Sequence, residues 1–370
     1  MKKKVLFVLA AFDKGGIEKV TLDIINNLDK EKYDITVKVI WFGGYCQSLV
    51  KDHIKVEPFF KKYVKGIMRF FRYAPKELVY RTYIKEKYDI EIAAGDGYPS
   101  RIIAGSPNKN SKKISWIHMD VKEKGANLRE FKNIEKAKAL YSCFDDIICV
   151  SKSCKKSFEE KFGFENLKVV YNPTNNLEIK KLADEKLEDL EIIKDGMINF
   201  IASGRIEEEK GFDKLARVHK RLIGENLKHR IILLGDGSKK KEIEDFIAKN
   251  KLKNTFQILG FKSNPYKYIK NADIFILSSR TEAYPTVLIE SLILGIPVMA
   301  TNCGGVNEIL EDGRLGMIVS HSEDEIYKGM KDIILQKDLY LEYREKVKLG
   351  LNKFNFDNDL KLFEEEFLGD

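Results

Sequence analysis

The chain has 370 residues and a mass of 42.7 kDa, which exceeds one ordinary domain and suits two domains of about 150–200 residues. Hydrophobic residues make up 44% and charged residues 33%, which excludes a disordered, collagenous or disulfide-scaffold protein. The net charge of +8 is uneven, because residues 1–174 carry +12 and the remainder carries −4, so we expect an anionic partner for the front half.

The first apolar stretch, Val5–Phe12, could pass for a signal peptide. It is short, however, and runs into Asp13 without a small-residue cleavage site. No apolar stretch in the sequence approaches the ~20 residues that a membrane-spanning helix needs. We therefore expect a buried first strand and a cytoplasmic protein. The five scattered cysteines show no zinc-binding spacing and predict reduced, buried side chains without a metal.

The front half alternates apolar strands with amphipathic helices. A strand at Lys4–Ala10 precedes Gly15 and Gly16, which break the chain before a helix at Ile17–Leu28. Further strands are expected, in chain order, at Ile35–Phe42, Ile90–Ala94, Ile114–His118, Ile147–Val150 and Leu167–Val170. Because strands that alternate with helices form parallel βαβ units, this half predicts a doubly wound sheet.

The same pattern starts again after the turn-rich segment Tyr171–Asn176, with the connection running to Asp195. The expected strands are Ile198–Ala202, Arg230–Leu234, Thr255–Leu259, Ile274–Ser278, Pro297–Ala300 and Met317–Val319, and the expected helices include Gly211–Leu222, Lys239–Lys249 and Thr286–Leu294. The predicted fold class is α/β, with two facing Rossmann-like domains, residues 1–174 and 175–353, that have parallel sheets. Ligands of such folds bind at the carboxyl ends of the strands, so we expect the site in the cleft between the domains.

The most informative segment is Glu282–Glu290, which directly follows a predicted strand. Pro285 and Thr286 suit a helix start, because proline is tolerated in the first turn and threonine can cap it. Backbone amides near Thr286 and Val287 would then form a seat for a diphosphate. Glu290 lies one turn deeper on the same face, inside an apolar helix where an unpaired carboxylate is costly. A solvated pair of glutamates is the alternative, but hydroxyl groups of a sugar and a ribose would suit these two carboxylates better.

Two other loops follow predicted strands of the back half. Arg205 and Lys210 lie in the first of these loops, where two cations can neutralise a leaving diphosphate. Gly235 and Gly237 lie in the second, where they either let a nucleotide approach the backbone or simply make a turn.

Together these motifs resemble the family 4 glycosyltransferases of the GT-B fold. The resemblance rests on Glu282 with Glu290 (an E-x7-E pattern), Gly204-Arg205 with Lys210-Gly211, Gly235-Asp-Gly237, and the front loop Gly15-Gly16. The segments Val150–Ser153 and Val169–Pro173 look like those that end the front domain in that family, so the likeness spans nearly the whole chain. It also implies that the last helix, within residues 354–370, packs back on the front domain.

The resemblance implies a retaining sugar transfer from a nucleotide sugar, with UDP favoured and with no metal or other cofactor. It assigns the donor diphosphate to Arg205 and Lys210, the donor-sugar hydroxyls to Glu282 and the ribose to Glu290. The other implied donor contacts are Gly15, Gly16, Gly204, Gly235, Gly237, Tyr284, Pro285, Thr286 and Val287. His118 matches the family's cleft histidine and completes a catalytic set with Glu282, Arg205 and Lys210. One departure is Ala283, where the family often has a glycine that reaches positive φ more easily, and this bears on the donor sugar.

The segment Phe59–Lys87 holds nine basic residues and two glutamates among many aromatic residues. A solvated helical face that covers the sheet is one interpretation. We favour an amphipathic surface on anionic lipid, which predicts peripheral association with the inner face of the cell membrane and a lipid-linked or polysaccharide acceptor. The expected membrane contacts are Lys61, Lys62, Lys65, Arg69, Phe70, Phe71 and Arg72. No nucleic-acid-binding motif accompanies them.

The predicted enzyme thus moves a hexosyl or N-acetylhexosaminyl group in surface-glycan biosynthesis, as in capsule or lipopolysaccharide. A nucleotide-sugar epimerase of the same fold is an alternative, but it needs no acceptor and no basic aromatic surface. A non-enzymatic basic binding protein is another, and it would have no affinity for nucleotides. A dehydrogenase is disfavoured, because neither Gly15-Gly16 nor Gly235-Asp-Gly237 completes the G-x-G-x-x-G fingerprint.

Overall fold

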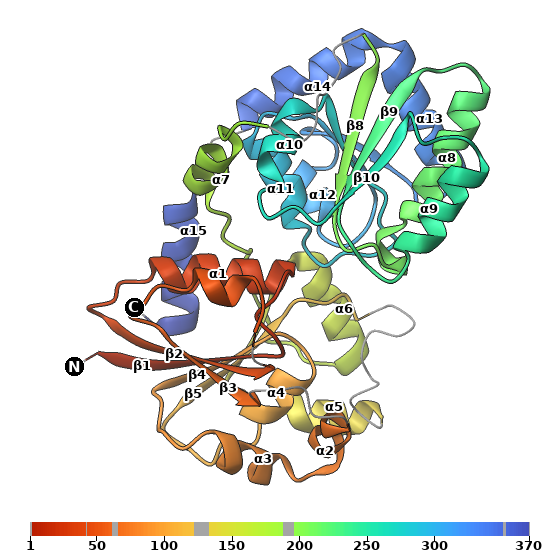
Figure 1. Ribbon diagram of the computed structural model, residues 1–370. Coiled ribbons are helices and arrows are strands. Elements are labelled where there is room, and N and C mark those ends of the chain that lie inside the picture. Colours follow the sequence, from red (N-terminus) through yellow and green to blue (C-terminus); the bar gives the residue numbers. More distant parts are fainter. Residues whose placement is uncertain are drawn as a thin grey trace. The chain divides into compact units, whose positions relative to one another are not determined.

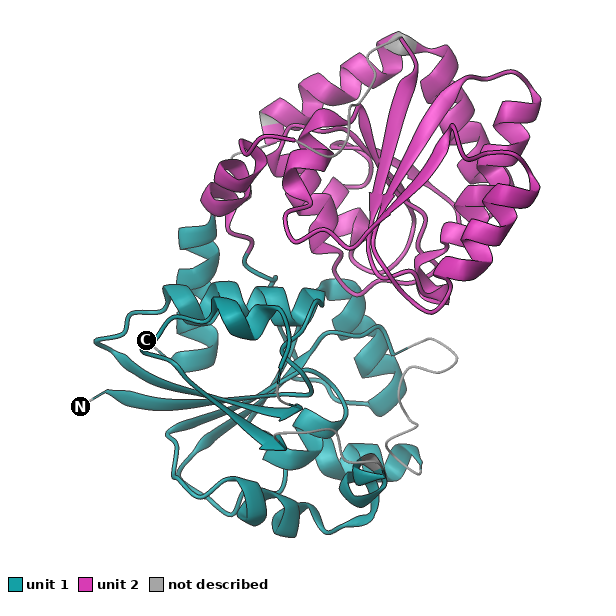
Figure 2. Cartoon of the chain, viewed as in Figure 1, with its two compact units in different colours: residues 1–173, 356–370 teal, residues 174–355 magenta. Residues whose placement is uncertain are grey.

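The computed structural model describes residues 2–41, 43–60, 66–121, 133–187, 196–350 and 353–369. The chain divides into two compact units, unit 1 with residues 1–173 and 356–370, and unit 2 with residues 174–355 (Figure 2). Each unit contains one parallel β-sheet flanked by helices (Figure 1), which confirms the predicted α/β fold class. Among the described residues, no helix combines the length and the apolar character needed to cross a membrane.

The sheet of unit 1 has seven strands in the order β3-β2-β1-β4-β5-β6-β7. The strands are β1 (Lys3–Leu9), β2 (Tyr33–Trp41), β3 (Lys55–Phe60), β4 (Ile90–Ala94), β5 (Lys112–Ile117), β6 (Asp146–Cys149) and β7 (Lys168–Val169). All five residues of β4 are buried, as in a parallel sheet covered on both faces. The strand β3 was not predicted, because Pro58 and the charges beside it do not look like a buried strand. It lies at the edge of the sheet, where proline is tolerated.

The helices of unit 1 connect these strands. They are α1 (Gly16–Asn27), α2 (Ile67–Tyr73), α3 (Lys76–Tyr83), α4 (Tyr98–Ile103), α5 (Ile134–Tyr141) and α6 (Lys152–Phe162), with a 3-10 turn η1 (Cys46–Leu49). The end of the chain returns as α15 (Phe356–Phe363) and a π-helical turn, η4 (Glu364–Leu368). There Phe363 and Phe367 lie against the buried Trp116 of β5, with ring centroids 5.5 and 5.2 Å from it.

The sheet of unit 2 has six strands in the order β10-β9-β8-β11-β12-β13. They are β8 (Ile198–Ser203), β9 (His229–Leu234), β10 (Phe256–Gly260), β11 (Ile274–Leu277), β12 (Val298–Thr301) and β13 (Met317–Val319). The helices are α7 (Asn176–Ala183), α8 (Phe212–Gly224), α9 (Lys240–Lys249), α10 (Tyr266–Asn271), α11 (Thr286–Ile293), α12 (Val306–Leu310), α13 (Glu323–Leu335) and α14 (Lys337–Gly350), with a 3-10 turn η2 (Glu208–Lys210).

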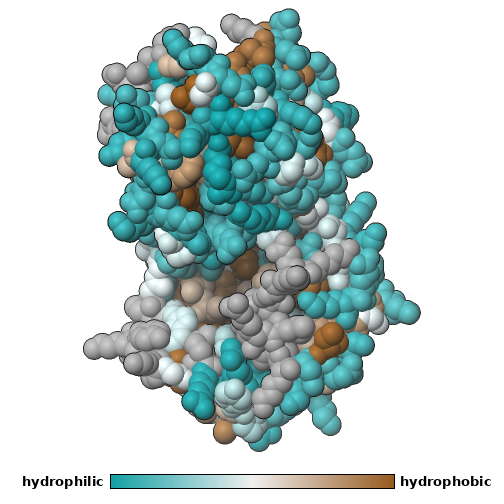
Figure 3. Space-filling model, turned by 90° about the vertical axis from the view of Figure 1, so that its right-hand side faces the viewer, coloured by the Kyte–Doolittle hydropathy of each residue, from teal (hydrophilic) through white to brown (hydrophobic). Residues whose placement is uncertain are grey.

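Successive residues of the central strand β8 point to two separate hydrophobic cores. Phe200 and Ala202 belong to the core under α8, α9 and α13, whereas Ile201 belongs to the core under α7, α10, α11 and α12. This alternation places helices on both faces of the sheet (Figure 1) and leaves its carboxyl edge to the loops. Hydrophilic side chains dominate the surface seen in Figure 3, in keeping with the high content of charged residues.

Two buried histidines join α8 to β9 in unit 2. His229 donates from Nδ1 to the carbonyl of Leu227 (2.8 Å), so its Nε2 is an acceptor for Nδ1 of His219 (2.7 Å). Nε2 of His219 then accepts from the hydroxyl of Thr255 (2.9 Å). Burial lowers the pKa of His219 to about 3 and that of His229 to about 4. Burial therefore keeps both imidazoles neutral at pH 7, and the chain of hydrogen bonds gives each of their four ring nitrogens a partner.

Candidate functional site

The candidate donor residues of the back half gather at the carboxyl edge of the unit 2 sheet, where β8, β9, β11 and β12 end. The loops after β8 and β9 are joined by backbone hydrogen bonds. The amide of Gly204 donates to the carbonyl of Leu234 (3.0 Å), and the amide of Ile206 donates to the carbonyl of Asp236 (2.8 Å). These two loops therefore hold each other in place.

Gly235 and Gly237 are required by this close approach. Gly235 has a φ of +148°, and a Cβ atom there would lie 1.9 Å from the carbonyl oxygen of Gly204. A Cβ atom on Gly237 would lie 2.4 Å from the carbonyl oxygen of Ile206. No side chain fits at either position, so the glycines serve the packing of loop on loop, whatever they do for a ligand.

The loop that carries Glu282 rests on the loop after β12 in the same way. Gly304 has a φ of +48°, and a Cβ atom on it would lie 1.6 Å from the carbonyl oxygen of Glu282. The amide of Gly305 donates to the carbonyl of Ala283 (3.0 Å). Ala283 is not among the residues with positive φ, so alanine replaces the family's glycine here without backbone strain.

Lys210 and Glu282 are brought together at this edge by loops 72 residues apart in the chain. Nζ of Lys210 lies 2.7 Å from Oε1 of Glu282, and the hydroxyl of Ser279 donates to the same oxygen (2.6 Å). The two side chains are only 21% and 10% exposed. The structure therefore holds a cation and an anion, both predicted to contact a donor, as a partly buried pair.

Arg205 is placed differently from Lys210. Its guanidinium is paired with Glu209 (3.4 Å), and its side chain is 66% exposed. Within the described part of unit 2 it forms no hydrogen bond or ion pair with Lys210 or Glu282. Of the two cations that the sequence predicts at the donor diphosphate, the structure thus pairs Lys210 with Glu282 and Arg205 with Glu209.

The helix after Glu282 begins where the sequence predicted, although its cap differs. α11 begins at Thr286, and Pro285 occupies the N-cap without a side-chain hydrogen bond. The prediction that Thr286 caps the helix is wrong, because Thr286 already belongs to the first turn. With no side chain over the helix end, the first-turn amides, including those of Thr286 and Val287, remain able to bind an anion.

Glu290 lies inside α11 and is half-buried. Its neighbours along the helix, Ile289 and Ser291, are buried. Tyr284 and Val287 pack against the hydrophobic core beneath α11. The structure thus places the whole Glu282–Glu290 segment at one edge of unit 2.

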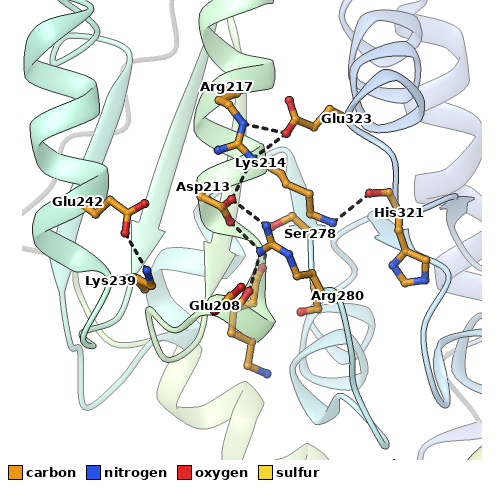
Figure 4. Close-up of polar contacts among 12 residues, drawn as sticks. Glu208, Asp213, Lys214, Arg217, Lys239, Glu242, Ser278, Arg280, His321 and Glu323 are labelled. Atoms are coloured by element: carbon orange, nitrogen blue, oxygen red, sulfur yellow. Dashed lines mark hydrogen bonds and ion pairs between the residues drawn. The ribbon is translucent and has the colours of Figure 1, made fainter. Parts of the chain in front are cut away.

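Several polar residues in or beside the loops after β8 and β11 were not predicted from the sequence, and Figure 4 labels them. Arg280 forks onto both carboxylate oxygens of Asp213, at 2.7 and 2.8 Å. Lys214, buried in α8, donates to the carbonyl of His321 (3.0 Å) after β13. The only signal in the sequence is position, because Asp213 follows Lys210 by three residues and Arg280 precedes Glu282 by two.

His118 lies in unit 1, just after β5. Its amide donates to Oδ2 of Asp96 (3.1 Å), and its ring lies against Trp116 with centroids 4.3 Å apart. Among the described residues, Nε2 of His118 and Oδ1 of Asp96 are buried without a hydrogen-bond partner. Burial lowers the pKa of His118 to about 3 and raises that of Asp96 to about 7. The imidazole is therefore neutral at pH 7.

Gly15 and Gly16 also belong to unit 1, at the start of α1. Gly15 is the N-cap, and a Cβ atom on it would overlap the carboxylate of Glu18, 1.9 Å from Oε2. A Cβ atom on Gly16 would meet nothing within 4 Å. Gly16 thus borders open space at the end of β1.

The basic aromatic segment is only partly described. Lys61, Lys62 and Lys65 lie outside the described residues. In α2, Arg69, Phe70 and Arg72 are exposed. Phe71 is only 1% exposed and packs against Phe59, Phe60, Tyr83 and Tyr98. Its assignment as a membrane contact is wrong, because the inner face of this short helix belongs to the core of unit 1.

Two family models match the chain. The model for Glycosyltransferase Family 4 matches residues 14–176, and the model for Glycosyl transferases group 1 matches residues 184–349. An uncharacterized glycosyltransferase of Haemophilus influenzae is 26% identical over 374 residues, 99% of each chain. A 4-alpha-N-acetylgalactosaminyltransferase of Campylobacter jejuni, which acts on a diphospho-undecaprenol glycan, is 28% identical over 220 residues, 58% of each chain.

Solved structures share the fold over the whole chain. HepE of Anabaena in complex with UDP and glucose has a TM-score of 0.78 at 20% identity and covers 100% of both chains. TarM of S. aureus has a TM-score of 0.75 at 13% identity and covers 99% of both chains. At these identities the likeness shows the fold alone.

Proposed function

The chain belongs to the family 4 glycosyltransferases of the GT-B fold, and we propose that unit 2 binds a UDP-linked hexose or N-acetylhexosamine as the donor. The acceptor in this proposal is a lipid-linked or polysaccharide glycan of the cell surface, and the transfer retains the anomeric configuration. The observation that carries the proposal is the ion pair of Lys210 and Glu282. Glu282 lies in the loop that leads directly into α11, and the first turn of α11 has no side-chain cap.

These groups suit the two ends of a sugar diphosphate. A diphosphate at the start of α11 would meet the positive end of the helix dipole and the ammonium group of Lys210. Glu282 would accept hydrogen bonds from sugar hydroxyls on one side, and Glu290, four residues along the helix from Thr286, from the ribose on the other. Binding would thus exchange the contact of Lys210 with Glu282 for contacts with the donor.

The chemistry needs charge stabilisation more than covalent help. The bond from the anomeric carbon to the diphosphate breaks, and a bond to the acceptor oxygen forms. Lys210 and the α11 amides would stabilise the negative charge that develops on the leaving diphosphate. Because these groups supply positive charge themselves, the proposed reaction is metal-independent. Within the described ranges no three His, Cys, Asp or Glu side chains are grouped as metal ligands.

The relatives support UDP and a lipid-linked acceptor. HepE has been solved with UDP and glucose, and the Campylobacter relative acts on a diphospho-undecaprenol glycan. A third relative serves the biosynthesis of amylovoran in Erwinia amylovora. The curated relatives among these are described as glycosyltransferases, so they support neither an epimerase nor a non-enzymatic binding protein.

A nucleotide panel on wild type and Glu290→Ala tests the donor site. We expect UDP, but not GDP, ADP or dTDP, to raise the melting temperature, since a ligand at 100 times its Kd stabilises a fold by ~2.7 kcal/mol. Glu290→Ala should lose this shift, because the ribose loses its acceptor. Glu244→Ala, on the exposed face of α9, is the matched control and should keep it. Unchanged UDP affinity in Glu290→Ala would remove Glu290 from the ribose role.

We also propose that α2 holds unit 1 on an anionic membrane through the exposed Arg69, Phe70 and Arg72. Replacing five of the nine basic residues of the segment by glutamine should reduce sedimentation with phosphatidylglycerol vesicles and spare donor hydrolysis. Those residues are Lys61, Lys62, Lys65, Arg69 and Arg72. A control with five exposed lysines elsewhere in unit 1 replaced carries the same charge change; these are Lys2, Lys30, Lys32, Lys51 and Lys55. Equal vesicle binding by the two variants would show that this segment is not a specific membrane-binding surface.

A further inference from the structure

Arg280 and Asp213 form a two-bonded ion pair in unit 2 (Figure 4). Nη1 and Nη2 of Arg280 each donate to one oxygen of Asp213, at 2.7 and 2.8 Å. Nη1 also donates to the carbonyl of Glu208 (2.6 Å). Such a fork fixes both the distance and the orientation of the two side chains.

The pair joins the two loops that carry the charged site residues. Asp213 lies in the first turn of α8, three residues after Lys210, and Arg280 lies two residues before Glu282. The backbones of these loops are joined as well, because the amide of Arg280 donates to the carbonyl of Glu209 (2.7 Å). The hydroxyl of Ser278 donates to the carbonyl of Lys210 (3.0 Å).

Gly211 brings the same two loops into direct contact. It has a φ of +66°, and a Cβ atom on it would lie 2.2 Å from the carbonyl oxygen of Ser278. Segments 208–213 and 278–282 are therefore joined both by these backbone contacts and by two ion pairs, Asp213 with Arg280 and Lys210 with Glu282.

Asp213 has a second arginine partner that does not join the loops. Arg217, one turn along α8, lies 2.9 Å from Oδ2 of Asp213 and also pairs with Glu323. Burial favours the neutral acid, but the hydrogen bonds and charges of Arg280 and Arg217 outweigh it and lower the pKa of Asp213. Arg217 thus shares the carboxylate and the charge of Arg280, but its hydrogen bonds and ion pairs within the described residues go to Asp213 and Glu323 and not to segment 278–282, which makes it a matched control.

We propose that the Asp213–Arg280 pair is a positioning clamp that holds the loops of Lys210 and Glu282 at the spacing at which these residues bind the diphosphate and the donor sugar. This inference rests on the proposed function. Arg280 does not contact the substrate in this role, because its guanidinium is occupied by Asp213 and Glu208. It acts by fixing where Glu282 meets the sugar relative to the diphosphate, and small displacements of such groups cost much of the rate.

The test compares Arg280→Gln and Asp213→Asn with Arg217→Gln. In the protein without nucleotide, hydrogen exchange should become faster in segments 206–214 and 278–284 of the first two variants and stay as in wild type in the third. Turnover of the UDP sugar that wild type accepts should fall about 10–100-fold in the first two variants only. Free UDP lacks the sugar that Glu282 would hold, so its Kd should change little. Arg280→Lys keeps the positive charge but loses the two-bonded geometry of the guanidinium. Its turnover and its hydrogen exchange should lie between those of Arg280→Gln and those of wild type.

Three outcomes would overturn the clamp. The first is Arg280→Gln with wild-type exchange and turnover, and the second is Arg217→Gln with the same defects as Arg280→Gln. The third is an equal loss of UDP affinity and turnover, which indicates general damage to unit 2. Glu282→Ala separates the two proposals: if it retains wild-type turnover, the proposed donor site fails, and if it is inactive while Arg280→Gln is normal, only the clamp fails.

Discussion

Replacing Lys210 by alanine is expected to lower donor turnover about 10²–10³-fold, the usual effect of removing one preorganised group that stabilises developing charge. Lys210 is the cation that the structure places against Glu282 (2.7 Å), whereas Arg205 is turned to Glu209 and is mostly exposed. Glu282 keeps the hydroxyl of Ser279 (2.6 Å) in the variant, so its loop should stay ordered. The measurement is kcat for a UDP sugar, with circular dichroism to show that the variant is folded.

The matched control is Lys331→Ala on α13. Lys331 also pairs with a glutamate, Glu225, at 2.9 Å, but it lies on a helix outside the candidate site. It should turn over donor as wild type does. Arg205→Ala should have a smaller effect than Lys210→Ala. A larger effect for Arg205 would show that the donor draws its guanidinium away from Glu209 and that the two cations act as the sequence predicted.

Acid is expected to destabilise unit 2 through His219 and His229. Their pKa values of about 3 and 4 lie below the value of 6.5 that an exposed imidazole has, so the unfolded chain binds protons that the folded chain excludes. The stabilisation is complete above about pH 6.5 and is lost as the pH falls towards 4 and 3. Each pKa unit is worth ~1.4 kcal/mol, so the loss reaches several kcal/mol near pH 4. Urea unfolding at a series of pH values measures it.

Variants identify the source of this pH dependence. The double variant His219→Gln, His229→Gln removes both titrating groups, so its stability should vary less between about pH 4 and 6.5. His53→Gln removes an exposed imidazole of unit 1 and should leave the wild-type profile unchanged. An unchanged profile in the double variant would assign the acid sensitivity to groups other than these two histidines.

The fold could be predicted because most strands are short apolar runs and most helices have their own apolar stripe. Both patterns depend on near neighbours in the chain. The strand β3 could not be found in this way, since Pro58 and the charges of an edge strand do not produce an apolar run. The orientation of α2 could not be found either, because a seven-residue helix is too short for periodicity to show that Phe71 points inward.

The candidate site could be predicted only in part, for a related reason. Lys210 and Glu282 were found separately, because each follows a strand at the same edge of the sheet. That they pair with each other depends on how two loops 72 residues apart pack. The partners Asp213 and Arg280 have no local pattern at all, and the close backbone contacts at Gly235 and Gly304 show in the sequence only as glycines.

The return of the chain to unit 1 has a consequence for synthesis on the ribosome. Trp116 is covered by Phe363 and Phe367, which are made after all of unit 2. Unit 2 is one continuous stretch, residues 174–355, and can fold as it emerges, since domains generally fold as units during synthesis. Until Phe363 and Phe367 have been synthesised, the Trp116 side of the unit 1 core stays uncovered. The half of the protein that is begun first is therefore the half that is completed last.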